Sequence, residues 1–238
     1  MAPAIRFVAA GSQIVVSTHG LFVVLAVCIG TLLAVRRARE PLLVLGVAPF
    51  AAAAALAGSH LLFRVEHGGP AGFWSGGLAS SGGVAAVTVV VATAARGSRR
   101  RLADLADAIA PAGILALGIG RLGCFLGGCC YGHSTDLPWG VVFPEVGPPA
   151  RHPLQLYSAG VDFLLTAMLL RTGGPPGAVA ARACVGLGVA RFFLELLRDP
   201  ATSDPLEGSG LTLAQGGALV LAVLGLLAAS CVRPAGGR

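Results

Sequence analysis

The sequence predicts an all-α fold, a polytopic membrane helix bundle with about seven transmembrane helices. Of its 238 residues, 55% are hydrophobic and only 12% are charged, and the mean hydropathy is +0.80. A soluble domain of this composition has too little polar surface to cover itself. The apolar residues also fall into runs of about 20, the length that a bilayer core requires. We therefore expect a single integral membrane domain over residues 1–238.

The expected spans follow one another with short connections. Pro and Gly interrupt several of them, which a bundle tolerates because neighbouring helices satisfy the freed backbone groups. The first apolar run is followed directly by arginines and lacks a small-residue cleavage site, so we interpret it as a retained span and not as a signal peptide. The expected spans lie near 15–35, 41–63, 76–96, 107–127, 154–171, 178–197 and 210–232.

Arginine placement orients the predicted bundle. All 17 basic residues are arginines, and the formal net charge of +6 suits loops that lie against anionic lipid. Basic and aromatic residues do not alternate in the way that would indicate nucleic-acid binding. Because cytoplasmic loops are enriched in arginine, we place the N-terminus outside, the C-terminus in the cytoplasm and the 128–153 loop outside. The richer side holds Arg36, Arg37, Arg39, Arg96, Arg99, Arg100, Arg101, Arg171, Arg233 and Arg238, and the other side holds Arg6, Arg64, Arg151 and Arg198.

Three further arginines fall inside predicted spans, of which Arg182 lies near the cytoplasmic start of its span and Arg121 and Arg191 lie deeper. Arg121 lies fourteen residues beyond Asp107 and Arg191 lies thirteen beyond Ala178, so both reach a depth of about 20 Å along their helices. A guanidinium among apolar residues is costly and by default marks a function. Two planar guanidiniums at one depth form a suitable fork for a lipid phosphate. The alternative is that each arginine pairs with an internal carboxylate, and Glu195, one turn after Arg191, is placed for that.

Three cysteines cluster after the fourth predicted span, and three interpretations stay open. Cys124, Cys129 and Cys130 are soft ligands that suit zinc or copper, but adjacent cysteines fit poorly around one tetrahedral ion. A disulfide from Cys124 to Cys129 or Cys130 is favoured if the helix breaks at Gly127 and Gly128. The third possibility is that the cysteines only pack. We expect no metal and no cofactor.

Six short blocks in the second half of the chain carry a resemblance to a known family. They are Asp107–Pro111, Gly120–Gly123, Tyr131–Pro144, Arg151–Tyr157, Arg191–Glu195 with Arg198–Pro200, and Gly210–Gln215. In order and spacing, these blocks resemble successive motifs of the prolipoprotein diacylglyceryl transferase family. The N-terminal third resembles the family in the arrangement of its motifs, but the motifs themselves match less closely.

The resemblance implies a multi-pass enzyme of the bacterial cytoplasmic (inner) membrane that works without a cofactor. Such an enzyme transfers the diacylglyceryl group of phosphatidylglycerol to the lipobox cysteine thiol of prolipoproteins, forming a thioether and releasing glycerol phosphate. The implied partners are phosphatidylglycerol, prolipoprotein signal peptides and membrane lipid, and not nucleic acid. We expect a monomer.

The same resemblance implies roles for individual residues. By position, Arg121 binds the lipid phosphate, and Arg191 gates or assists the binding of that phosphate. Glu195 orients Arg191, and Gly132 allows a close approach of the backbone. The expected catalytic residues are Arg121, Arg191, Glu195, His19 and His133. The expected substrate-binding residues are Arg121, Gly132, Ser81, Cys124, Gln155 and Tyr157.

Three of these positions depart from the family's usual residues. His19, Ser81 and Cys124 stand where the family usually has a tyrosine, a histidine and an asparagine. His19 and His133, whose unperturbed pKa is near 6.5, are the candidates for the base. Two other function classes therefore stay open. One is a catalytically diverged paralogue that binds phospholipid, and the other is a membrane thiol or metal module that uses Cys124, Cys129 and Cys130.

Overall fold

The computed structural model describes residues 4–9, 12–67, 80–200, 203, 205, 206 and 208–232. Over these residues the chain is almost entirely helical, with two small antiparallel hairpins. The elements in order are β1 (Ala4–Ala9), β2 (Ser12–Ser17), α1 (Thr18–Arg37), α2 (Pro41–His67), α3 (Ser80–Ala94), α4 (Arg99–Gly127), α5 (Leu154–Arg171), α6 (Ala178–Glu195), β3 (Pro205–Leu206), β4 (Leu211–Thr212) and α7 (Leu213–Cys231).

The helices agree with the seven apolar runs, with two differences. Helix α4 begins at Arg99, eight residues before the expected start, because Ser98 caps its first turn. The β1–β2 hairpin before α1 was not predicted. Within the described residues, α1, α2, α4 and α7 are long and apolar enough to cross a membrane. The prediction of an all-α membrane protein is therefore confirmed, and the number of membrane spans stays a prediction.

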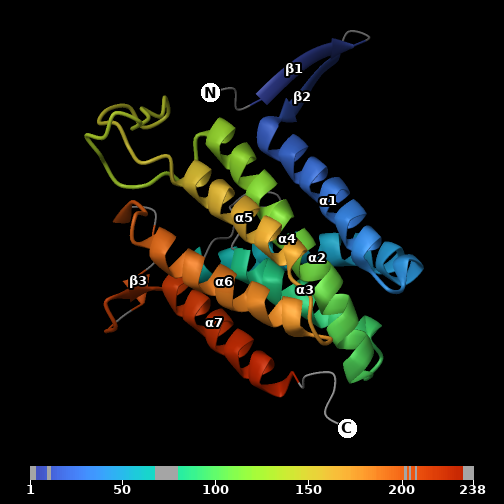
Figure 1. The fold of residues 1–238 in the computed structure, drawn as a ribbon. Helices are drawn as coiled ribbons and strands as arrows, with labels where there is room; N and C mark the ends of the chain where they lie inside the picture. The colour runs from blue at the N-terminus through green and yellow to red at the C-terminus, as the bar shows by residue number, and fades with distance from the viewer. Residues whose placement is uncertain are drawn as a thin grey trace.

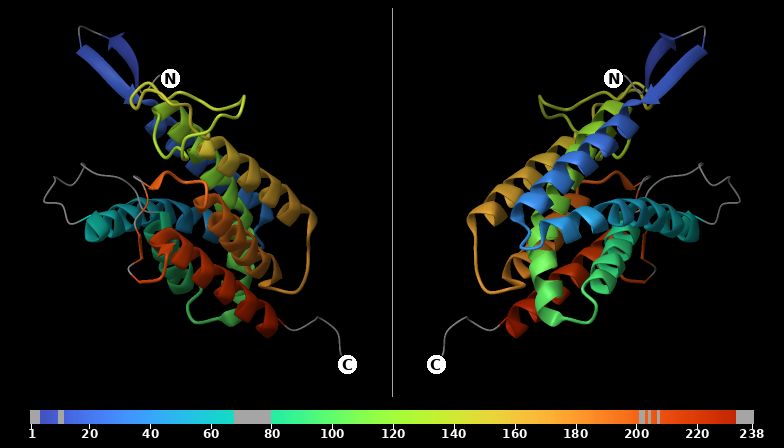
Figure 2. Two further views of the ribbon diagram at one scale, coloured as in Figure 1. Left: turned by 90° about the vertical axis from the view of Figure 1, so that its left-hand side faces the viewer. Right: turned by 90° about the vertical axis from the view of Figure 1, so that its right-hand side faces the viewer.

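Helix α4, with 29 residues, lies at the centre of the fold (Figure 1). It packs against α1, α5 and α6, and α7 packs on the far side of α6. Helices α2 and α3 pack against each other and project sideways from the rest of the bundle (Figure 2). The arrangement brings the end of α4, the start of α5 and the end of α6 to one side of the molecule (Figure 1).

Small residues allow α6 and α7 to approach closely. A Cβ at Gly188 would lie 2.6 Å from the carbonyl oxygen of Ala218, and one at Gly225 would lie 2.8 Å from that of Ala181. Lipid offers no hydrophobic drive between helices, so close backbone packing of this kind holds them together. The two glycines thereby fix α7 against the helix that carries Arg191.

Asp107 joins α4 to the beginning of α6. Its carboxylate accepts hydrogen bonds from the backbone N–H groups of Gly177 (2.8 Å) and Ala180 (2.7 Å). These are N–H groups that the first turn of a helix leaves without an intrahelical partner, and a negative charge there also suits the helix dipole. The start of α6 is therefore fixed by a residue two turns inside α4.

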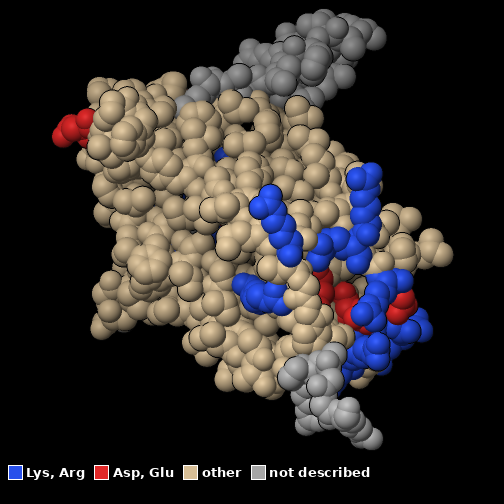
Figure 3. Space-filling view, viewed as in Figure 1, with Lys and Arg blue, Asp and Glu red and all other residues tan. Residues whose placement is uncertain are grey.

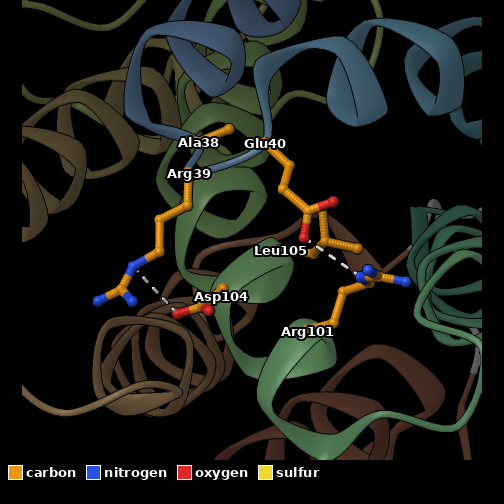
Figure 4. A pocket seen from close by; sticks show the side chains of 6 residues that line it. All are labelled: Ala38, Arg39, Glu40, Arg101, Asp104 and Leu105. Atoms are coloured by element: carbon orange, nitrogen blue, oxygen red, sulfur yellow. Dashed lines mark hydrogen bonds and ion pairs between the residues drawn. The ribbon is translucent and has the colours of Figure 1, made fainter.

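Arginine side chains gather at one end of the molecule, where α1 ends and α4 begins (Figure 3). We call this the arginine-rich end and define it by Arg36, Arg37, Arg39, Arg99, Arg100 and Arg101. Two ion pairs there join the α1–α2 turn to α4 (Figure 4). They are Arg39–Asp104 at 3.5 Å and Arg101–Glu40 at 3.2 Å.

Candidate functional site

The loop between α4 and α5 folds back onto the end of α6. The backbone N–H of Gly132 donates to the carbonyl of His152 (2.9 Å), and that of His133 donates to the carbonyl of Leu197 (3.0 Å). The N–H of His152 donates in turn to the carbonyl of His133 (3.1 Å). The three elements that carry the expected site residues are therefore held together by backbone hydrogen bonds.

Gly132 lies where these segments are closest. A Cβ at this position would lie 2.5 Å from the carbonyl oxygen of Leu197 and 2.8 Å from the Cβ of His152. The contact is between Gly132 and its own protein backbone, which agrees with the expectation that this glycine permits a close approach. Whether lipid also approaches there stays a prediction.

Arg191 pairs with an internal acid that differs from the expected one. Its guanidinium lies 2.6 Å from Asp162 Oδ2 on α5, and the Asp162 side chain is completely buried. We expected Glu195 to orient Arg191, but Glu195 instead accepts from Arg198 at 2.8 Å. The expectation was wrong because Glu195 lies at the end of α6, where the chain turns and brings Arg198 back beside it.

A third ion pair closes this side of the molecule. Arg151, at the end of the loop, pairs with Asp199, and its guanidinium carbon lies 5.0 Å from the centre of the Tyr131 ring. The two paired side chains are only 18% and 13% exposed, so solvent screens them little. We call the three pairs Arg151–Asp199, Arg191–Asp162 and Arg198–Glu195 the buried ion-pair end.

Arg121 differs from these three arginines. It lies on α4, near enough for its charge to act on both Asp162 and Arg191. Yet Arg121 forms no hydrogen bond or ion pair with any residue that the structure describes. The three neighbouring arginines are each paired with a carboxylate, whereas Arg121 has no carboxylate partner among the described residues.

Tyr157 lies under the loop and receives hydrogen bonds from it. Its hydroxyl accepts from Trp139 Nε1 at 2.7 Å and lies 3.3 Å from His152 Nδ1. His152 is buried, and its ring packs edge-on against that of His133 at 4.8 Å. Burial, followed by the nearby charge of His133, lowers the pKa of His152. His152 is therefore neutral at pH 7, as a buried structural residue should be.

Gln155 fixes the beginning of the loop. Its side chain is almost fully buried, and its amide nitrogen donates to the carbonyl of Cys129. The amide oxygen of Gln155 is also buried and accepts no hydrogen bond from the described residues. Gln155 thus positions Cys129, and one polar atom of its side chain stays available for a further donor.

The three cysteines come together as free thiols. The sulfur atoms of Cys124, Cys129 and Cys130 all lie within 4.8 Å of one another, and Cys124 Sγ lies 3.8 Å from His19 Nδ1 on α1. Hydrogen bonds from Cys124 and Cys129 lower the pKa of Cys130, as do the charges of Arg121 and Arg198. Hydrogen bonding with Cys124 and Cys130 raises the pKa of Cys129. Cys130 is therefore the most acidic thiol of the cluster.

The remaining expected residues are placed as follows. His133 lies in the loop, with its Nδ1 atom 3.0 Å from the carbonyl of Ser134. Ser81 lies in the first turn of α3, but its side chain falls outside the part of the chain that the structure describes. Asp199 and Arg198 had no assigned site role. The sequence signal for a site role was that an arginine and an aspartate follow directly after the sixth span. Sequence spacing alone does not identify the partner of either residue.

Comparisons with known proteins agree with the resemblance that the six sequence blocks carry. The family model described as Prolipoprotein diacylglyceryl transferase matches residues 7–231. A phosphatidylglycerol–prolipoprotein diacylglyceryl transferase from Aeromonas hydrophila is 32% identical over 158 residues, which cover 65% of this chain and 58% of the relative.

A protein of the same name from Photobacterium profundum is 37% identical over 146 residues, or 60% of this chain and 55% of that relative. Another, from Aliivibrio salmonicida, is 35% identical over 158 residues, or 65% and 56%. The chain thus spans less than three fifths of the length of these curated relatives. Since the family model covers nearly the whole chain, the protein belongs to the prolipoprotein diacylglyceryl transferase family.

Proposed function

We propose that this protein transfers the diacylglyceryl group of phosphatidylglycerol to the lipobox cysteine of prolipoproteins. The observation that carries the proposal is the charge left on Arg121. Three arginines at this end have a carboxylate partner, and Arg121 has none among the residues that the structure describes. A cation kept free among apolar helices is costly, and an anionic lipid headgroup offsets that cost.

In the proposed reaction, the lipobox thiolate attacks the glyceryl carbon that bears the phosphate ester. A carbon–sulfur bond forms, the carbon–oxygen bond breaks, and glycerol phosphate leaves with the electron pair and the negative charge. Arg121 stabilises that charge as it develops on the phosphate oxygens. Arg191, held by Asp162, lies beside it and donates to the same group as the headgroup enters.

The thiol proton passes to a histidine. His19, on α1, already lies beside the sulfur of Cys124, three residues after Arg121 and so on the same face of α4. His133 is farther along the loop and is held by its contact with His152. His19 is therefore the first candidate for the base and His133 the second.

The other expected residues shape the headgroup region. Gln155 and Tyr157 lie at the beginning of α5, under the loop, and each forms a hydrogen bond with a loop residue. Both therefore contribute to lipid binding by positioning the residues around the headgroup. Gly132 keeps the loop against α6, and Glu195 holds Arg198. Cys124 and Ser81 contact lipid or peptide in this proposal.

The proposed topology has seven spans in the bacterial inner membrane. Helices α5 and α6 cross despite carrying Asp162 and Arg191, because these two charges neutralise each other inside the bundle. The arginine-rich end lies in the cytoplasm and the loop of residues 128–153 lies outside. The N-terminus is then outside and the C-terminus inside, and the chain acts as a monomer.

Transfer of a diacylglyceryl group in phosphatidylglycerol vesicles to a synthetic lipobox peptide, followed by mass spectrometry, tests the proposal. Arg121→Ala should lower kcat by about 10²–10³, as the loss of one charge-stabilising donor does. Arg121→Lys should recover only part of it, since an ammonium lacks the planar fork. Arg182→Ala is the matched control, because Arg182 is an exposed arginine that donates to Gly173 near the other end of α6.

Full transfer by Arg121→Ala would contradict the proposal. A wild-type protein that binds phosphatidylglycerol but never modifies the peptide would instead be the lipid-binding paralogue.

A further inference from the structure

The three-cysteine cluster at the end of α4 has no part in the chemical step of the proposed reaction, in which Cys124 only contacts lipid or peptide. Cys124 lies in the helix, and Cys129 and Cys130 lie in the loop that follows, so a regular backbone conformation would not bring the three side chains together. Consecutive side chains such as those of Cys129 and Cys130 point to different sides in most backbone conformations. The proximity of the three sulfur atoms therefore depends on the backbone conformation after α4.

Two left-handed residues turn the chain back onto α4. Gly128 caps the helix with φ 75°, and the N–H of Cys129 donates to the carbonyl of Cys124 at 3.2 Å. Cys130 itself has φ 60°, a conformation that costs free energy for a residue other than glycine. Together these turns place both loop sulfur atoms beside that of Cys124. They also remove the objection that adjacent cysteines fit poorly around one ion.

The separation of the sulfur atoms suits a zinc ion. With zinc–sulfur bonds of about 2.3 Å, tetrahedral geometry places two thiolate ligands about 3.8 Å apart. The three sulfur atoms lie within 4.8 Å of one another, so small side-chain rotations are sufficient. Three thiolates leave one tetrahedral position, which a water molecule can fill, and His19 Nδ1 lies beside the site at 3.8 Å from Cys124 Sγ.

The charge around the cluster suits thiolate ligands. Arg121 precedes Cys124 by one turn of α4, and Arg198 faces Cys130 from the end of α6. Zn²⁺ itself offsets two of the three thiolate charges, and Arg198 lies beside the third, on Cys130. Gln155 adds support by holding the Cys129 carbonyl, an interaction of the kind that orients ligands around metal sites.

We propose that Cys124, Cys129 and Cys130 bind one Zn²⁺ ion as thiolates at the end of α4. The site fastens the start of the loop to the helix that carries Arg121. It stands on its own geometry and does not depend on the transferase activity. The ion is a borderline-soft cation with no redox chemistry, so binding requires only the loss of the three thiol protons.

The test uses the full-length protein in detergent micelles, reduced with a phosphine, stripped of metal and titrated with Co²⁺. We expect one Co²⁺ per chain, with sulfur-to-cobalt charge-transfer absorption that Zn²⁺ abolishes by displacement. Cys124→Ser and Cys130→Ser should lose this absorption. Cys184→Ser is the control, because Cys184 lies within α6, and it should bind as the wild type does.

A second measurement avoids any dependence on variants that fail to fold. In the wild-type protein, Zn²⁺ should protect the three cluster thiols from alkylation and leave the alkylation of Cys28 and Cys231 unchanged, as read peptide by peptide. Absence of the charge-transfer absorption in the reduced protein would overturn the proposal. So would equal binding by Cys124→Ser, or recovery of Cys124 in a disulfide with metal-free Cys129 or Cys130.

Discussion

The two ends of the helix bundle both carry arginine–carboxylate pairs, but they differ in burial. At the arginine-rich end, the side chains of Arg39 and Asp104 are 64% and 21% exposed. At the buried ion-pair end, those of Arg191 and Asp162 are 20% and 0% exposed. Exposed pairs are worth little because water already solvates both charges, whereas a buried charge that loses its partner has no substitute. Ion pairs thus contribute little to stability at the arginine-rich end and hold α5 and α6 together at the buried ion-pair end.

The largest expected effect is at Asp162. Asp162→Asn should lower the free energy of unfolding by about 3–5 kcal/mol, because it leaves the Arg191 charge buried without a counter-charge. Unfolding in mixed detergent and sodium dodecyl sulfate micelles measures the change. The double variant Asp162→Asn, Arg191→Gln should recover much of the loss, since it removes both charges. A single variant as stable as the wild type would place Arg191 in contact with water and end the contrast between the two ends.

Arg121 sharpens the same comparison because no carboxylate in the described part of the chain pairs with it. Arg121→Ala should not lower the free energy of unfolding, because it removes a cation that is costly among apolar helices and has no carboxylate partner among the described residues. The large loss of kcat expected for the same variant would then come from the missing substrate contact alone. A substantial loss of stability would instead show that Arg121 has a structural partner in the membrane.

The sequence was sufficient to predict the helices, because apolar runs and the bilayer thickness determine their length. It was also sufficient to single out Arg121 and Arg191, since a charge in such a run is conspicuous. Their surroundings were not predictable. Glu195 is one turn from Arg191 in sequence, whereas the real partner Asp162 lies on another helix, and only the packing of α5 against α6 decides between them.

The cysteine cluster was predictable in part for the same reason. Spacing placed Cys124, Cys129 and Cys130 near one helix end, but their mutual orientation depends on the left-handed conformation of Cys130. Left-handed backbone at a residue other than glycine has no dependable sequence signature. The β1–β2 hairpin was missed because the first apolar run gave no turn signal strong enough to separate its strands from the helix that follows.

A smaller effect is expected at Gly132, where the loop meets α6. Gly132→Ala should lower the free energy of unfolding by about 1–3 kcal/mol, because the added methyl group meets a backbone carbonyl that has little room to move. Gly160→Ala is a suitable control, since a Cβ at Gly160 has nothing within 4 Å and should be neutral or stabilising. Equal effects of the two variants would show that the loop is not held as closely as the structure has it.

At the other end of α6, Asp107 should have an effect of intermediate size. Asp107→Ala removes both hydrogen bonds to the first turn of α6 and should cost about 0.5–2 kcal/mol, as the loss of a helix cap does. Asp107→Asn keeps an amide oxygen that accepts one of the two bonds, so its loss should be smaller. Thermal unfolding in detergent distinguishes the two variants. Melting temperatures of both variants equal to that of the wild type would mean that α6 begins without help from α4.

The smallest effect is expected at the exposed pair of Glu40 and Arg101. Glu40→Gln should change the free energy of unfolding by only about 0.2–1 kcal/mol, because both side chains are well exposed and water replaces the lost contact. Salt should weaken the wild-type pair and leave the variant unaffected, so the difference between them should vanish as the ionic strength rises. A loss as large as that of Asp162→Asn, persisting in high salt, would mean that a neighbouring surface buries this pair in the membrane and that both ends of the bundle depend on their ion pairs alike.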